Sequence, residues 1–175
     1  MIEADLNNLP QMLTAANGVD IIINTAAEVR NASFLEKTNV GGTHNIVSVI
    51  KKCKVKKLIH LSSVGVAGYQ YSNKKLSVTE ESTCHPKNEY ERTKLASEQI
   101  LIAAQKEINF HLDIIRPTNV FGEEHPFNAL LGLINYTKKE KPFIYAKGAM
   151  VNYVYVKDIL FLMEKLMLMN EAIGI

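Results

Sequence analysis

A tyrosine and a lysine four residues apart are the strongest chemical feature of this 175-residue chain. In a helix, Tyr90 and Lys94 would stand on one face, one turn apart. A phenol with an ordinary pKa of about 10 is a poor base at neutral pH, but a neighbouring ammonium group favours the phenolate and lowers that pKa. The spacing suggests that Tyr90 is a general acid/base tuned by Lys94, although such a pair also occurs on helices where it has no role.

The apolar pattern predicts the elements that would position this pair. Strands are expected at residues 21–23, 57–61 and 111–116, and helices at residues 34–52 and 89–107, the second capped by Asn88. Strands separated by such long helices are typical of parallel βαβ crossovers, so the predicted fold class is α/β. Further along, a helix is expected at residues 129–136, strands at residues 143–145 and 152–155, and a helix from Asp158.

Three polar segments follow the three predicted strands directly. They are residues 24–27 (NTAA), residues 62–68 (SSVGVAG) and residues 116–122 (RPTNVFG). In an open parallel sheet, ligands bind outside the carboxyl ends of the strands, so these segments should meet at one edge. Ser63 is the hydroxyl that we expect to accompany Tyr90 there, although a serine at a strand end can also simply bond its own backbone.

Composition excludes several other classes of function. The chain is 47% apolar and its net charge is +2, which favours a globular protein and argues against nucleic acid or a membrane as the partner. Five lysines between residues 51 and 57 are interpreted as solvated cations at a helix end. No apolar run approaches the length of a membrane span, and the first residues show no basic region followed by an apolar block, so we expect a cytoplasmic protein. The two cysteines and five histidines lack metal-site spacing, and no metal is expected.

Six segments in order give the sequence a family resemblance. They are residues 19–27 (VDIIINTAA), 38–45 (TNVGGTHN), 62–63 (SS), 90–94 (YERTK), 116–122 (RPTNVFG) and 154–159 (VYVKDI). The sequence resembles the extended short-chain dehydrogenase/reductases, the NAD-dependent epimerase/dehydratase family. The resemblance implies a Rossmann-like parallel sheet with flanking helices. Residues 1–175 would form a partial NAD(P)-binding Rossmann domain, in which residues 123–175 begin the substrate-binding part.

The resemblance also assigns roles to individual positions. By resemblance, the catalytic residues are Ser63, Tyr90 and Lys94. The cofactor would contact Asp5, Leu6, Ala26, Ala27, Ser62, Tyr90, Lys94 and Pro117, and the substrate would contact Ser63 and Asn119. Asn39 would help to organise the active-site backbone, although it could equally cap the helix that begins near it.

The implied reaction is the NAD-dependent epimerisation of a nucleotide-linked sugar through a transient ketone, with Tyr90 as general acid/base. NADP is the alternative cofactor, and the parent enzyme is expected to be a homodimer. A 4,6-dehydratase is disfavoured, because that subfamily has Asp-Glu after the catalytic hydroxyl where this chain has Val64 and Gly65. The main alternative is an NAD(P)H-dependent ketone reductase, and another is a non-catalytic fragment or subunit.

The glycine pattern departs from the family. The nine glycines form neither GxGxxG nor GxxGxxG, the pattern whose backbone amides bind the cofactor pyrophosphate. We therefore expect a fold truncated at both ends, without the glycine-rich loop and without most of the C-terminal substrate domain.

Overall fold

Three parallel strands form the centre of the protein, which is described here from a computed structural model covering residues 2–68, 78–123, 129–138 and 151–169. Strands β1 (Ile21–Asn24), β2 (Lys57–Leu61) and β3 (His111–Ile115) pair in that order. The register sets Asn24 opposite His60 and Leu61 opposite Ile115, so the carboxyl ends of the strands lie at one edge of the sheet. The predicted α/β class and Rossmann-like parallel sheet are confirmed.

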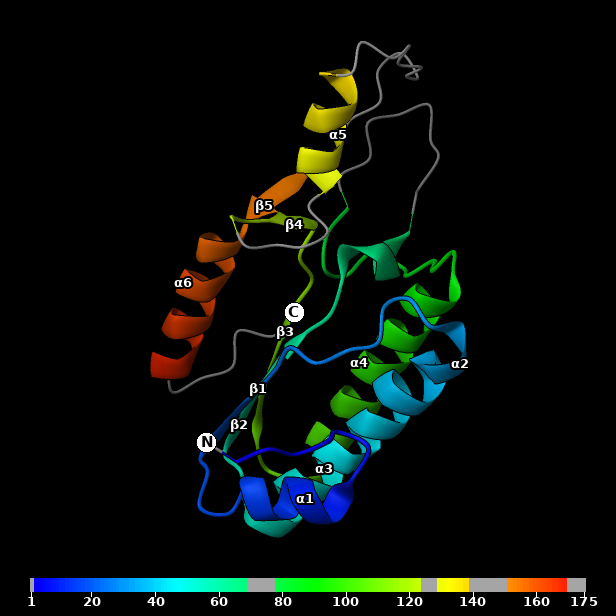
Figure 1. Ribbon diagram of the computed structural model, residues 1–175. Helices are drawn as coiled ribbons and strands as arrows, with labels where there is room; N and C mark the ends of the chain where they lie inside the picture. The colour runs from blue at the N-terminus through cyan, green and yellow to red at the C-terminus, as the bar shows by residue number, and fades with distance from the viewer. Residues whose placement is uncertain (1, 69–77, 124–128, 139–150, 170–175) are drawn as a thin grey trace.

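Helices cover both faces of this sheet (Figure 1). Helices α1 (Leu9–Ala15), α2 (Ala32–Leu35), α3 (Gly42–Cys53) and α4 (Glu89–Glu107) lie on one side, and α6 (Val156–Leu168) lies on the other. The larger core packs Ile46, Ile50 and Leu101 from the helices against Leu58 and the other inward residues of the sheet. On the opposite face, Ile59 packs against Ile159, Met163 and Leu166 of α6.

The helix expected at residues 34–52 is interrupted by a π-helical segment. Residues Glu36–Gly41 form this segment between α2 and α3, and Asn39 is buried within it. The backbone carbonyl of Asn39 accepts hydrogen bonds from Thr43 Oγ1 at 2.6 Å and from Ser97 Oγ at 2.8 Å. Such π-bulges occur frequently at functional sites, and apolar periodicity does not distinguish them from an α-helix.

A second, two-stranded sheet lies beyond the main one. It pairs β4 (Asn119–Phe121), which was not predicted, with β5 (Tyr153–Tyr155) in parallel. Helix α5 (Ala129–Thr137) follows the sequence prediction, whereas α6 begins at Val156, two residues before the expected start. The strand predicted at residues 143–145 lies outside the described residues. The assignment of residues 123–175 to a substrate-binding part stays a prediction.

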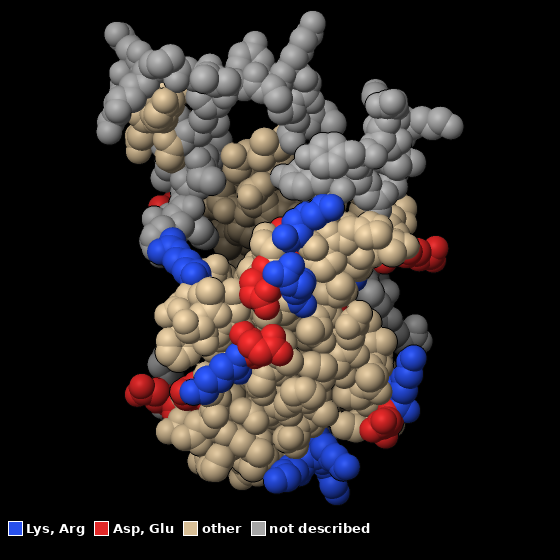
Figure 2. Space-filling model, turned by 90° about the vertical axis from the view of Figure 1, so that its right-hand side faces the viewer, with Lys and Arg blue, Asp and Glu red and all other residues tan. Residues whose placement is uncertain are grey.

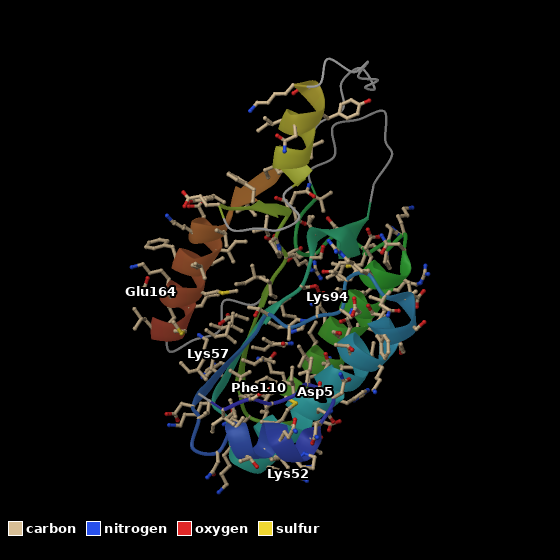
Figure 3. All side chains as sticks on the ribbon, viewed as in Figure 1. Asp5, Lys52, Lys57, Lys94, Phe110 and Glu164 are labelled. Carbon is tan, nitrogen blue, oxygen red and sulfur yellow. The ribbon has the colours of Figure 1, made fainter. Side chains whose placement is uncertain are left out.

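One lysine of the cluster at residues 51–57 is buried, contrary to the sequence interpretation. Lys57, which begins β2, bridges Asp113 on β3 with 3.0 Å between Nζ and Oδ2. The same ammonium donates to the carbonyls of Leu166 at 2.5 Å and Met169 at 3.1 Å. Since unsatisfied carbonyls gather at a helix C-terminus, Lys57 joins the end of α6 to the sheet (Figure 3).

Charged side chains are dispersed over the outer surface. Figure 2 shows basic and acidic residues interspersed on the face that carries α2, α3 and α4, without a broad patch of one sign. Among the described residues, no helix is both long and apolar enough to cross a membrane.

Candidate active site

Ser63 lies at the carboxyl edge of the sheet, at the start of a 3-10 helix, η2 (Val64–Ala67). The backbone of Ser63 is extended, and its Oγ accepts a hydrogen bond from the Gly65 amide at 3.1 Å. The strand pairing continues past β2, because the Ser62 amide donates to Ile115 O at 2.7 Å and the Val64 amide donates to Pro117 O at 3.0 Å. Ser63 therefore lies between two backbone bonds that join its neighbours to the end of β3 and to the segment after it.

Gly68 closes this segment with a backbone that only glycine fits. Its φ is +68°, and a Cβ there would lie 2.0 Å from the carbonyl oxygen of His85. The amide of Gly68 donates to Gly65 O at 3.0 Å. A side chain at position 68 would clash with the backbone at His85, which precedes α4. Glycine therefore allows the segment that follows Ser63 to contact the segment that precedes α4.

Tyr90 lies in the first turn of α4, which starts as the sequence predicts. The side chain of Asn88 accepts a hydrogen bond from the Glu91 amide at 2.9 Å and caps the helix. Tyr90 is half-buried, and burial followed by the charge of Glu91 raises the pKa of its phenol above the ordinary value. This is opposite to the expected effect of Lys94.

Lys94 is buried one turn after Tyr90. Its Nζ donates to the carbonyl of Leu61, the last residue of β2, at 2.6 Å. Burial lowers the pKa of Lys94 to about 8, although Glu98 acts in the opposite direction. Figure 3 shows Lys94 between α4 and the upper end of the sheet. The bond to Leu61 fixes the helix to the strand end, and the pKa of Tyr90 is set by burial and by Glu91 in this conformation.

A cleft of about 400 Å³ brings several predicted residues together. Ser63, Pro117 and Asn119 all line it, and so does Glu91, the residue next to Tyr90. Asn119 donates from Nδ2 to the carbonyl of Asn152 at 3.0 Å, which joins β4 to the segment before β5. The strand ends, the start of α4 and the second sheet thus contribute to one concave site.

A second, more apolar hollow of about 300 Å³ contains two of the predicted adenosine-contacting residues. Leu6 and Ala26 line it together with residues of α1. Leu6 packs over Gly42, where a Cβ would lie 2.6 Å from the leucine side chain. Ala27 is half-buried beside Ala26, and Asp5 is exposed, with Oδ1 accepting from the Asn7 amide at 2.9 Å. The structure brings Leu6 and Ala26 together although they are separated by α1 and β1.

Asn39 connects the loop after β1 with the helix that carries Tyr90. Its Oδ1 accepts from the Glu28 amide at 2.8 Å, and its Nδ2 donates to Glu28 O at 3.0 Å and to Thr93 Oγ1 at 2.9 Å. The Asn39 side chain makes no helix-capping bond, since Asn31 caps α2 and neither Leu35 nor Gly41 supplies a side-chain cap. The expected role in organising the backbone fits this geometry better than the capping alternative.

The comparison of the sequence with protein families gives a match along almost the whole chain. The model of the family described as "NAD dependent epimerase/dehydratase family" matches residues 1–174. The chain belongs to this family. The matched range includes the segments at the three strand ends that the structure brings to one edge of the sheet.

Individual curated proteins match a smaller part of the chain. An N-acetyl-alpha-D-glucosaminyl-diphospho-ditrans,octacis-undecaprenol 4-epimerase from Escherichia coli O157:H7 is 32% identical over 131 residues, which is 71% of this chain and 38% of the relative. A decarboxylating sterol-4-alpha-carboxylate 3-dehydrogenase from Candida albicans is 30% identical over 108 residues, 59% of this chain and 30% of the relative.

Solved structures share the fold. The dTDP-glucose 4,6-dehydratase DesIV from Streptomyces venezuelae, crystallised as a double mutant with NAD and DAU bound, superposes with a TM-score of 0.83 at 24% identity. That match covers 98% of this chain and 55% of the dehydratase. The chain thus spans about half the length of the proteins that it resembles.

The family resemblance assigned no role to two charged residues beside the site, Glu98 and Arg116. Glu98 is fully buried on α4, and its carboxylate accepts hydrogen bonds from the hydroxyl of Ser62 and from Arg116 Nε at 3.0 Å and Nη2 at 2.6 Å. The hydroxyl of Ser62, a predicted cofactor contact, is therefore directed to Glu98 in this conformation. The spacing in the sequence could have indicated Glu98, because Tyr90, Lys94 and Glu98 follow each other at intervals of four residues and therefore share one helix face.

His60 shows a second feature that sequence reasoning did not reach. It is buried on β2, and Asn24 Nδ2 lies 3.0 Å from its Nδ1. Burial, with a smaller contribution from the charge of Lys94, lowers the pKa of His60 to about 3. This histidine is neutral at physiological pH, and its burial fits a packing role in the sheet.

Proposed function

We propose that the protein takes part in NAD-dependent epimerisation of a nucleotide-linked sugar. The observation that carries the proposal is the cleft in which Ser63, Pro117 and Asn119 meet beside the first turn of α4, where Tyr90 lies. Several relatives are nucleotide-sugar enzymes by their names, among them a putative UDP-glucose 4-epimerase from Methanocaldococcus jannaschii that is 28% identical over 153 residues.

The residues present fit a dinucleotide at two places. The hollow at Leu6 and Ala26 offers apolar walls of the kind that an adenine ring requires, and Asp5 lies beside it. At the other end, Pro117 O holds the backbone next to Ser63, where a nicotinamide ring would lie. Bound NAD+ would supply the acceptor for the hydride that leaves the carbinol carbon of the sugar.

Within that reaction, Tyr90 would remove the proton from the sugar hydroxyl as the carbonyl forms. Ser63 would donate a hydrogen bond to the same oxygen and stabilise the charge that develops on it. Rotation of the resulting ketone in the cleft would expose its opposite face. The hydride would then return to the carbon on that face and Tyr90 would return the proton to the oxygen, which completes the inversion. Lys94 would keep α4 at the required distance from the strand end through its bond to Leu61.

The elevated pKa of Tyr90 bears on this assignment. Burial and Glu91 favour the neutral phenol, so Tyr90 is a better proton donor than a base in the conformation described. A positively charged nicotinamide ring beside the phenol would favour the phenolate by the same electrostatic argument. Proton removal by Tyr90 is therefore proposed for the complex with the oxidised cofactor.

The test uses the full-length protein, because the chain spans about half the length of its relatives. Purified protein with NAD is incubated with UDP-glucose, UDP-N-acetylglucosamine and dTDP-glucose, and the products are identified by proton NMR. We expect a 4-epimer with no net change in NADH absorbance. Stoichiometric consumption of NADPH with a ketone would indicate the reductase alternative, and loss of water from the sugar would indicate a dehydratase. The proposals of a homodimer and a cytoplasmic location are checked separately by sedimentation and by imaging.

A further inference from the structure

Glu91 gives the cleft beside Ser63 its charge. Among the described residues that line this cleft, Glu91 is the one charged side chain, and the others are apolar, hydroxyl or amide residues and glycines. It is half-buried, unlike its neighbour Glu89, which is exposed and pairs with Arg92 on the outer surface of α4. Within the described lining, a ligand in the cleft would thus meet one negative charge that is partly shielded from solvent.

Two backbone interactions hold Glu91 in this position. Its amide donates to the side chain of Asn88 at 2.9 Å, and its Oε2 accepts from the amide of Lys87 at 2.5 Å. The side chain is therefore ordered by the helix cap and is not a mobile surface carboxylate. Its orientation follows from the same residues that start α4 and position Tyr90.

Glu91 Oε1 faces the segment that carries Ser63. A Cβ added at Gly65 would lie 3.1 Å from Oε1 and 2.9 Å from Cγ of Glu91, so the missing side chain of Gly65 is what allows the carboxylate to sit there. The Gly65 amide in turn bonds Ser63 Oγ. The influence of the carboxylate on the reaction site is already visible at Tyr90, whose pKa is raised by burial and then by Glu91.

We propose that Glu91 is a specificity-determining residue of this cleft, which accepts hydrogen bonds from hydroxyl or amino groups of the sugar and excludes sugars that carry a carboxylate. The proposal rests on the proposed function, since it concerns the sugar part of a nucleotide-linked substrate. The physical reason is that two like charges a few ångströms apart in a half-buried site repel strongly, whereas a neutral hydroxyl group can donate to the carboxylate.

UDP-glucose and UDP-glucuronic acid provide a matched pair of probes, because they differ in having a hydroxymethyl or a carboxylate group on the same ring. Their dissociation constants are measured by calorimetry on the full-length protein with Tyr90→Phe, which prevents turnover. Three proteins are compared: the Tyr90→Phe protein, Tyr90→Phe combined with Glu91→Gln, and Tyr90→Phe combined with Glu89→Gln as the control. We expect the preference for UDP-glucose to fall roughly tenfold or more with Glu91→Gln and to stay unchanged with Glu89→Gln.

Gly65→Ala provides a second variant that keeps the charge but displaces it. The new methyl group would press on Glu91 Cγ, and the preference for UDP-glucose should again decrease. Thermal melts check that each variant is folded. If the protein binds neither nucleotide sugar, the proposed function is wrong and this inference falls with it. If it binds them but both Glu91→Gln and Gly65→Ala leave the preference unchanged, the inference alone is wrong.

Discussion

Lys94 on α4 donates a hydrogen bond from its buried ammonium group to the backbone carbonyl of Leu61 on β2, 2.6 Å away. Leu61 directly precedes Ser62 and Ser63, so this bond joins the helix that carries Tyr90 to the strand end that carries the candidate hydroxyl. The position disfavours the charged form of the amine, and burial lowers the pKa of Lys94 to about 8. A charged lysine in this place should therefore cost stability in a pH-dependent way.

We predict that the free energy of unfolding will reveal the lowered pKa of Lys94. Between about pH 8 and the ordinary value of 10.5, the unfolded chain binds a proton that the folded chain has lost, so the contribution of Lys94 to stability rises with pH in this window. Each pKa unit corresponds to about 1.4 kcal/mol, which puts the whole effect at a few kcal/mol. Urea unfolding of the wild type and Lys94→Met, repeated across this pH range, measures it.

Lys106→Met is the matched control for this experiment, because Lys106 is exposed in the last turn of the same helix. The stability difference between the wild type and Lys94→Met should change in favour of the wild type as the pH rises. The difference for Lys106→Met should stay constant. A constant difference for both variants would show that the pKa of Lys94 is ordinary.

Tyr90→Phe should abolish most of the activity of the full-length protein while it leaves cofactor binding nearly intact. The substitution removes the proton-transfer group and little contact area, so turnover should fall by roughly 10²–10⁴-fold. The turnover number and the dissociation constant of NAD+ are measured side by side. Tyr136→Phe, at an exposed position on α5, is the control and should retain full activity. Equal turnover of Tyr90→Phe and the wild type would rule out the assignment.

The buried ion pair between Glu98 and Arg116 should contribute strongly to stability. Glu98→Gln leaves the guanidinium of Arg116, whose side chain is 13% exposed, without a counter-charge, and it weakens the bond from Ser62. We expect a loss of about 3 kcal/mol in the free energy of unfolding, as for other buried pairs from which one partner is removed. Guanidinium unfolding of the chain measures this loss.

Two further variants separate the ion pair from a general effect of removing a carboxylate. Glu89→Gln removes an exposed partner of Arg92 and should change stability by less than about 0.5 kcal/mol. Glu98→Gln combined with Arg116→Met should be less harmful than the sum of the two single changes, because the pair is then removed as a unit. Additive losses would mean that Glu98 and Arg116 do not interact in solution.

Sequence reasoning recovered the elements whose signal is local. Each of the three strands has three apolar residues within four or five positions, and Asn88 stands directly before the first turn of α4, so both features could be recognised in the sequence. Strand β4 and the π-helical segment were not, since β4 has three residues and a π-turn leaves the apolar pattern of a helix intact.

Three residues that line the cleft could be indicated from the sequence, but the electrostatics around them could not. The segments after the strands indicated Ser63, Pro117 and Asn119, because parallel strands end at the same edge of a sheet. The burial of Lys57, the pairing of Glu98 with Arg116 and the bond from Lys94 to Leu61 depend on contacts over long sequence separations. A charged residue in the sequence looks the same whether it is solvated or buried beside a partner.

β1 is one of the two edge strands of the main sheet in the described residues. In the described residues, β1 pairs with β2 along one side. Ile23 lies on the same face of the sheet as Ile59, which packs against α6, and Ile23 is 38% exposed. An edge strand with an exposed apolar side chain presents unpaired backbone groups to other molecules. Parallel sheets are normally covered on both faces, so this edge favours association of the chain with a second copy.

We predict that the 175-residue chain expressed alone will be aggregated or held in dimers through β1. It should also show no saturable NAD+ binding, because it lacks a glycine-rich phosphate loop. Ile23→Lys places a charge at the edge and should shift the chain toward the monomer in sedimentation velocity experiments. Val29→Lys, at an exposed position in the loop after β1, is the control and should leave the association unchanged. A monodisperse wild-type monomer with a cooperative thermal transition would contradict the prediction, because the edge of β1 would then be protected in solution without a partner.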